Sequence, residues 1–328
     1  MSEWKPNAGP QKCALPPPQT AFDRADGGLG NASESVSTAP VAVDAPHGGT
    51  IGPLGLPEPI SRPLLADLTG GQGAGRAAVQ SATQPRSGLI RLLGAYTIEG
   101  AGGRREVTTT DTRALLGLLA EHRTMLLSSE EMVAKLWAGA LPSPERHRTV
   151  LKDARGKLCE ALGQSADRGK DLIENVRASG CRLNPDLVTC DVWQFRDLLA
   201  AAAAADDHDR HAILTAAVNL HEGPYLSGVT HGWARSAARS ITGELVQALS
   251  QLAALETDPE LAAAHLERAA GVAPATEHLH RRLMQHYAKM NKNAAVHHTY
   301  QRLTEHLAER GAKPEMQTVR LYSQLVGE

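Results

Sequence analysis

The sequence of 328 residues predicts a mainly α-helical protein in three parts: an N-terminal tail without regular structure, a small mixed α/β domain and an all-helical C-terminal region. Proline and glycine make up 25 of the first 88 residues. Residues 89–190 combine short β-prone runs with amphipathic helical segments. From residue 191 onward apolar residues recur at helical spacing. These observations place the parts at residues 1–88, 89–190 and 191–328.

The first 88 residues are predicted to be a disordered tail or linker. They hold 12 of the 19 prolines and 13 of the 30 glycines, with no periodic apolar pattern. Such a stretch cannot bury enough apolar surface to offset its chain entropy. A tail of this composition also indicates that the chain can be one part of a longer polypeptide.

Composition excludes several classes of protein. No apolar run reaches the roughly 18 residues that a membrane-spanning helix needs, so we expect no membrane segment in this chain. The four cysteines show neither CxxC pairs nor metal-ligand spacing, which favours a reducing cytoplasm and predicts no metal site. No catalytic motif or phosphate loop is present, so we expect no enzyme and no cofactor.

The middle region begins with β structure. Leu89–Ile98 is predicted to be a strand, followed by a glycine-rich turn and a partner strand at Glu106–Thr109. Further on, Leu172–Arg177 and Cys181–Leu183 form a predicted hairpin that turns at Ser179-Gly180. The β structure therefore flanks a central helical stretch.

Three helices are predicted between the strand and the hairpin. Thr110 or Asp111 caps the first helix, which runs to about Glu121. The second begins at Ser128-Ser129-Glu130-Glu131, which has the spacing of a capping box. The third begins at Ser143-Pro144 and runs to about Leu162, before Gly163. A strand, three helices and a β-hairpin in this order are typical of a winged helix-turn-helix domain.

The third helix is the candidate DNA-recognition helix. The chain carries 34 basic and 36 acidic residues, and no region is basic overall, so any DNA contact must come from a local patch. Residues 146–157 hold five basic side chains, and those at 148, 152 and 155 gather on one side of the helix, off the apolar face. A solvated helix face is the alternative interpretation. The predicted DNA-binding residues are Arg146, Arg148, Thr149, Lys152, Arg155, Lys157 and, in the wing, Arg177.

The C-terminal region is predicted to be a tetratricopeptide-like helical array. Helical segments are separated by breaks at Gly223-Pro224, Gly228, Asp258-Pro259, Pro274, Asn291–Asn293 and Gly311–Pro314. The pattern of Ala263–Ala270 returns about 32 residues later at Ala295–Leu303, a period typical of stacked helix pairs. Each such hairpin buries its apolar face against its neighbours.

Two adjacent stretches together resemble the Streptomyces antibiotic regulatory protein family, in which an OmpR-type winged helix precedes a bacterial transcriptional activator domain. In residues 89–195 the resemblance is carried by Leu92-Leu93-Gly94, Leu115–Leu119, Ser129-Glu130-Glu131, Leu136-Trp137, Ala154–Leu158, Val176-Arg177 and Gly180–Leu183. In residues 191–328 it is carried by Asp191-Val192, Phe195, Gly223–Leu226, Trp233-Ala234, Arg281–Met284, Tyr287, Tyr300, Leu303, Pro314 and Thr318.

The resemblance implies a sequence-specific transcriptional regulator, most simply an activator, located in the cytoplasm. The winged helix is expected to bind double-stranded promoter DNA, with a homodimer or tandem protomers head-to-tail on direct repeats. The helical array is expected to mediate self-association or to contact an effector, and the loop Ala138–Pro144 is the expected contact with RNA polymerase. The alternative is an interaction scaffold whose winged helix does not bind DNA.

Overall fold

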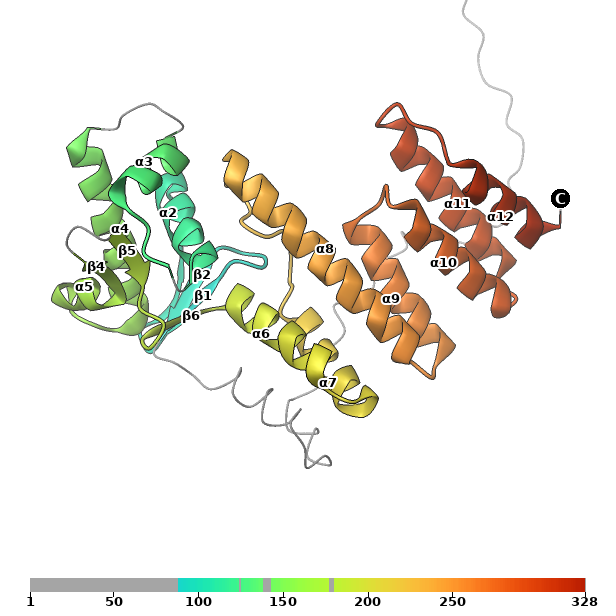
Figure 1. Ribbon diagram of the computed structural model, residues 1–328, viewed down its shortest axis with the longest axis horizontal. Coiled ribbons are helices and arrows are strands. Elements are labelled where there is room, and N and C mark those ends of the chain that lie inside the picture. The colour runs from blue at the N-terminus through green and yellow to red at the C-terminus, as the bar shows by residue number, and fades with distance from the viewer. Residues whose placement is uncertain (1–87, 124, 138–142, 177–179, 328) are drawn as a thin grey trace, which may run out of the picture. The chain divides into compact units, whose positions relative to one another are not determined.

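The computed structural model describes residues 88–123, 125–137, 143–176 and 180–327 (Figure 1). All of them belong to one compact unit of the chain. The predicted disordered tail at residues 1–88 lies outside the described residues, apart from Gly88. The mainly helical fold class, with a small sheet followed by an all-helical region, is confirmed.

A four-stranded sheet opens the described chain, in the order β3-β2-β1-β6. Its strands are β1 (Gly88–Arg91), β2 (Thr97–Gly100), β3 (Gly103–Glu106) and β6 (Val188–Cys190). β1 pairs antiparallel with β2 and parallel with β6, and β2 pairs antiparallel with β3. The last strand therefore brings the chain back beside the first one, just before the helical array begins.

The prediction of one strand over Leu89–Ile98 was wrong. The chain leaves the sheet after β1, turns at Gly94 with a φ of 146°, and returns as β2. The partner strand is Gly103–Glu106, not Glu106–Thr109. The physical reason is tertiary, because the backbone groups of Leu92 and Leu93 bond residues of the array and not a neighbouring strand.

The three predicted helices are present as α2 (Thr110–Glu121), α3 (Ser129–Trp137) and α4 (Pro144–Leu162). Ser128 and Glu131 form the capping box of α3, since each side chain accepts the other residue's backbone N–H at 3.0–3.1 Å. The Ser143 side chain accepts the backbone N–H of Arg146 at the start of α4. For α2 the N-cap is Thr109 and no side chain caps it, in contrast to the prediction.

The end of α4 leads into the wing. Gly163 follows α4 with a φ of 66°, the left-handed conformation that glycine adopts most easily. The short helices η2 (Ala166–Arg168) and α5 (Gly169–Leu172) then precede the hairpin of β4 (Ile173–Val176) and β5 (Gly180–Leu183). Residues 177–179, including Arg177, lie outside the described residues. The helices and the hairpin follow in the order of a winged helix.

From Asp191 onward the described chain is helical, and consecutive helices pack on one another (Figure 1). Each predicted Gly, Pro and Asn break lies in a connection between two helices or at its edge. The helices are α6 (Asp191–Ala204), α7 (Asp207–Asn219), α8 (Gly232–Leu255), α9 (Pro259–Val272), α10 (Glu277–Lys289), α11 (Asn293–Ala308) and α12 (Met316–Val326). These helices form the expected array of packed pairs.

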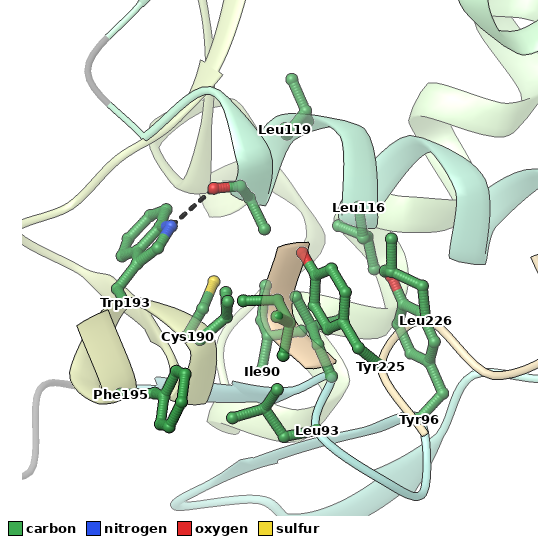
Figure 2. Close-up of a cluster of buried hydrophobic side chains, with 14 of the residues drawn as sticks. Ile90, Leu93, Tyr96, Leu116, Leu119, Cys190, Trp193, Phe195, Tyr225 and Leu226 are labelled. Atoms are coloured by element: carbon green, nitrogen blue, oxygen red, sulfur yellow. Dashed lines mark hydrogen bonds between the residues drawn. The ribbon is translucent and has the colours of Figure 1, made fainter. Parts of the chain in front are cut away.

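One hydrophobic core spans the winged helix and the first half of the array. Buried side chains run without interruption from β1 and α2 to α6, α7 and α8. Figure 2 shows Trp193 donating its indole N–H to the Ala120 carbonyl, at 2.6 Å. A second cluster lies between α9, α10 and α11. The predicted domain boundary at residues 190/191 coincides with the end of β6 and the start of α6, which follow each other directly. The division into two domains at this point stays a prediction.

Candidate nucleic-acid interface

Helix α4 has a buried face and an exposed face, as the sequence pattern predicts. The buried residues are Val150, Leu151, Ala154, Leu158, Cys159, Ala161 and Leu162. The exposed face near the N-terminus of the helix holds Arg146, Arg148, Thr149 and Lys152. The apolar face packs on α2 and the sheet, which leaves the basic face in contact with solvent.

Arg148 and Lys152 are the cations of this helix that are open to a ligand. They are one helical turn apart, so their side chains project from the same face. Both are exposed, and within the part of the chain that the structure describes neither side chain makes a hydrogen bond or ion pair. Cations of this kind are available to neutralise phosphates or to bond base edges.

Helix α2 fixes the start of α4. Arg146 donates from Nε and Nη2 to the Asp111 carboxylate at 3.0 and 2.9 Å. The hydroxyl of Thr112, itself fully buried, donates to Asp153 at 2.6 Å. The ion pair of Arg146 is exposed and contributes little to stability, but it occupies this guanidinium. Arg146 is therefore less free to bind phosphate than Arg148.

Thr149 and Lys157 make local contacts within α4. The Thr149 hydroxyl donates to the backbone carbonyl of Glu145 at 2.8 Å, one turn earlier. The Lys157 ammonium lies 3.6 Å from the Glu160 carboxylate. Thr149 is exposed beside Arg148, whereas Lys157 lies two turns closer to the C-terminus of the helix.

Arg155 occupies a different environment from the other predicted site residues. It is only partly exposed, and its Nη2 donates to the backbone carbonyl of Ile173 in the wing at 2.8 Å. Burial lowers the pKa of its guanidinium from the usual value. Its aliphatic part packs closely on Gly169, where an added Cβ would lie 2.8 Å from the Cβ of Arg155. In this structure Arg155 ties α4 to the wing.

The wing and the loop Ala138–Pro144, where contact with RNA polymerase is expected, are described only in part. Arg177 lies outside the described residues, and Arg182, on β5, pairs with Glu174 on β4 at 2.7 Å. Residues 138–142 of the loop Ala138–Pro144 also lie outside them. Leu136, near the end of α3, is fixed by the array, because its carbonyl lies 2.8 Å from Nε2 of His231.

Sequence reasoning used Asp191 for the family resemblance but gave it no structural role, although it is the most buried acidic residue of the described chain. Its carboxylate accepts backbone N–H groups of Leu92, Leu93 and Val192 at 2.8–3.0 Å, and the residue is 1% exposed. Burial raises its pKa to about 6, against the lowering effect of these bonds. The signal in the sequence was an acid in the first turn of α6, directly after a buried strand.

The array adds bonds to the same connection between β1 and β2. The backbone N–H groups of Glu222 and Gly223 donate to the Leu93 carbonyl at 2.8 and 3.1 Å, and Leu226 donates to the Leu92 carbonyl. The Tyr225 hydroxyl donates to Glu121 at the end of α2. Figure 2 shows Tyr225 and Leu226 beside Leu93 in the shared core. The position of the connection between β1 and β2 is therefore set partly by the array.

The described residues contain no group of three or more His, Cys, Asp and Glu side chains arranged to hold a metal ion. Cys159, Cys181 and Cys190 are buried free thiols, and burial raises the pKa of each. None of the described helices is long and apolar enough to cross a membrane. Because burial raises their pKa values, Cys159, Cys181 and Cys190 offer no reactive thiolate at neutral pH.

Comparison with known families identifies the helical array. The family model described as the bacterial transcriptional activator domain matches residues 190–326, from the end of β6 to the end of α12. The array is therefore a bacterial transcriptional activator domain. The resemblance predicted from the sequence is thereby confirmed, with the activator domain in the predicted order behind the winged helix.

One solved structure shares the fold. The structure of Mycobacterium tuberculosis EmbR in complex with a low-affinity phosphopeptide matches 74% of this chain with a TM-score of 0.55 and 21% sequence identity. The chain covers 66% of the length of the EmbR chain, and the similarity at this identity shows the fold alone. No curated protein matches the chain. The match to the activator domain indicates a transcriptional regulator.

Proposed function

We propose that the chain is a sequence-specific activator that binds promoter DNA through the exposed face of α4. The observation that carries the proposal is the pair Arg148 and Lys152, exposed on one face of a helix that has capped ends and lies beside a hairpin. Phosphate contacts supply affinity and orientation, and a helix in the major groove supplies sequence discrimination. Because promoter DNA lies in the cytoplasm, the proposal places the protein there.

Six of the seven predicted DNA-binding residues lie in the described chain, and their side chains differ in how far they are already paired. Arg148 and Lys152 are proposed as direct DNA contacts, and Thr149 beside them as a phosphate or thymine-methyl contact. Arg146 and Lys157 are proposed to make weaker phosphate contacts, because each side chain already forms an ion pair with an acidic residue. Arg155 is proposed to position the wing, and with it Arg177, on the neighbouring groove.

The array is proposed to hold two protomers together on DNA. A single winged helix covers a short half-site, so specificity generally requires two copies. By family resemblance the copies sit head-to-tail on direct repeats, and residues 138–144 contact RNA polymerase. The EmbR structure holds a phosphopeptide, and for this chain we propose, in general terms, that the array contacts another protein.

The test is a selection of bound oligonucleotides from a random pool, followed by mobility shift with the full chain. The selected fragment should bind the parent protein and lose at least about tenfold in affinity when Arg148 and Lys152 are both changed to Ala. The matched control changes Arg310 and Lys313, exposed cations between α11 and α12, to Ala. Failure to select any sequence, with normal folding, favours the scaffold alternative.

A further inference from the structure

The array contains a cleft between α10 and α12, well outside the α4 face, which is lined mostly by residues with polar end groups. Its volume is about 510 Å³, within the range of ligand-binding clefts. The two helices pack directly on each other (Figure 1). The lining residues are His278, Arg281, Arg282 and Gln285 from α10 and Gln317, Arg320, Leu321 and Gln324 from α12.

The spacing of these residues shows that the sequence encodes the cleft. On each helix they fall at i, i+3, i+4 and i+7, which is the pattern of a single helix face. In a packed array such a face is ordinarily apolar, because it is buried against the next helix. Here Leu321 is the one apolar residue among the eight, so two polar faces meet at an angle and leave an open cleft.

A polar network, buried at Thr318 and exposed at Glu315, fixes the walls of the cleft. Arg281 donates to the Glu315 carboxylate at 2.8 Å and to the Thr318 hydroxyl at 2.7 Å. Glu277 accepts the Thr318 hydroxyl at 2.6 Å and the backbone N–H of Glu315 at 2.9 Å. Thr318 is fully buried. The cleft is therefore already formed before any ligand binds, which lowers the entropic cost of binding.

Two guanidinium groups in the cleft are available for a ligand. Arg282 makes a single 3.3 Å hydrogen bond to the Ser250 carbonyl. Arg320 is exposed, and among the described residues its side chain has no bonded partner. The glutamines Gln285, Gln317 and Gln324 are exposed as well, and each amide offers both a donor and an acceptor.

We propose that this cleft binds an extended acidic segment of a partner protein. The glutamine amides match the alternating N–H and C=O groups of an extended main chain, and Arg282 and Arg320 match carboxylates, which a guanidinium binds bidentately. This proposal rests on the proposed function, in which the array contacts another protein, and it names the kind of segment that is bound.

The local charge favours a peptide over a nucleic acid. The carboxylates of Glu277 and Glu315 lie at the cleft and already hold Arg281, at 3.9 and 2.8 Å. Among the residues that line the cleft, the arginines that then remain to balance an incoming anion are Arg282 and Arg320. Two cations suit a ligand with a few carboxylates, whereas a nucleic acid strand brings a phosphate at every nucleotide and requires a longer run of basic contacts.

The test measures binding of a short fluorescein-labelled peptide, with Glu alternating with Ser, to the full chain by fluorescence anisotropy. The double variant Arg282→Gln and Arg320→Gln should bind at least about tenfold more weakly, since each loses charge-assisted hydrogen bonds. The matched control, Arg235→Gln with Arg239→Gln, removes two exposed cations from α8 and should bind like the parent. Unchanged circular dichroism establishes that the variants fold.

Three results overturn the proposal. The first is equal binding of the peptide by the parent and the Arg282/Arg320 variant. The second is equal binding of a Gln-Ser peptide of the same length. The third is displacement of the peptide by inorganic phosphate, or by a thymidine oligonucleotide of the same net charge, at a lower concentration than by the unlabelled peptide itself. Promoter binding by the Arg282/Arg320 variant stays at the parent level, so failure here is distinct from failure of DNA binding.

Discussion

Asp191→Asn tests the joint between the winged helix and the array. The substitution keeps the shape of the side chain and one carbonyl acceptor, but it removes the buried negative charge that faces Leu92, Leu93 and Val192. Burial raises the folded-state pKa of Asp191 from 3.8 to about 6. The folded chain therefore binds a proton more tightly at this carboxyl than the unfolded chain does.

The sign of the pH dependence follows from this difference. Between pH 4 and pH 6 the folded state holds more protons, so the contribution of Asp191 to stability is present below pH 4 and is lost as the pH rises through 6. At about 1.4 kcal/mol for each pH unit, the loss is about 3 kcal/mol. Asn does not titrate, so the variant lacks this loss.

The assay is urea unfolding of both proteins at pH 4 and at pH 7, followed by circular dichroism. The difference in unfolding free energy, parent minus variant, should fall by about 3 kcal/mol between the two pH values. The variant also loses an acceptor for the backbone N–H groups. This loss changes the difference in unfolding free energy by the same amount at pH 4 and at pH 7, so it does not affect the comparison. A difference that stays constant with pH would refute the raised pKa and the account of this buried carboxylate.

Two further predictions concern α4. Leu151→Ala, at a position 7% exposed in the shared core, should lower the unfolding free energy by about 2–5 kcal/mol, and a loss below 1 kcal/mol in denaturant titration would contradict the packing of α4. Arg155→Ala should remove the bond to the Ile173 carbonyl and speed amide hydrogen exchange in β4 and β5, while Arg148→Ala should leave that exchange unchanged. Equal exchange in the two variants would show that Arg155 does not hold the wing.

Local signals in the sequence were enough for the helices of this fold. Ser128 with Glu131, Ser143 with Pro144, and Gly163 bond or bend the backbone within a few residues of their own position, so their effect is visible in the sequence. The helices of the array after α7 could be predicted in the same way, because glycines, prolines and asparagines mark the breaks between them.

Long-range contacts account for what the sequence did not predict. β1 ends early because Asp191, about 100 residues away, binds the backbone of Leu92 and Leu93. Arg155 lies off the apolar arc on a helical wheel, but the wheel does not include the wing, which covers this side chain. The α10–α12 cleft likewise depends on two helix faces that meet only in the folded array.

The central claim is that α4 binds DNA through Arg148 and Lys152. The most direct measurement is the affinity of the full chain for the selected promoter fragment over a series of salt concentrations. If both residues neutralise phosphates, each change to Ala should reduce the slope of log affinity against log salt by about one, and the double variant by about two. The Arg310→Ala, Lys313→Ala control should keep the parent slope. An Arg148→Glu, Lys152→Glu variant that folds normally and binds the fragment with parent affinity and slope would contradict the account.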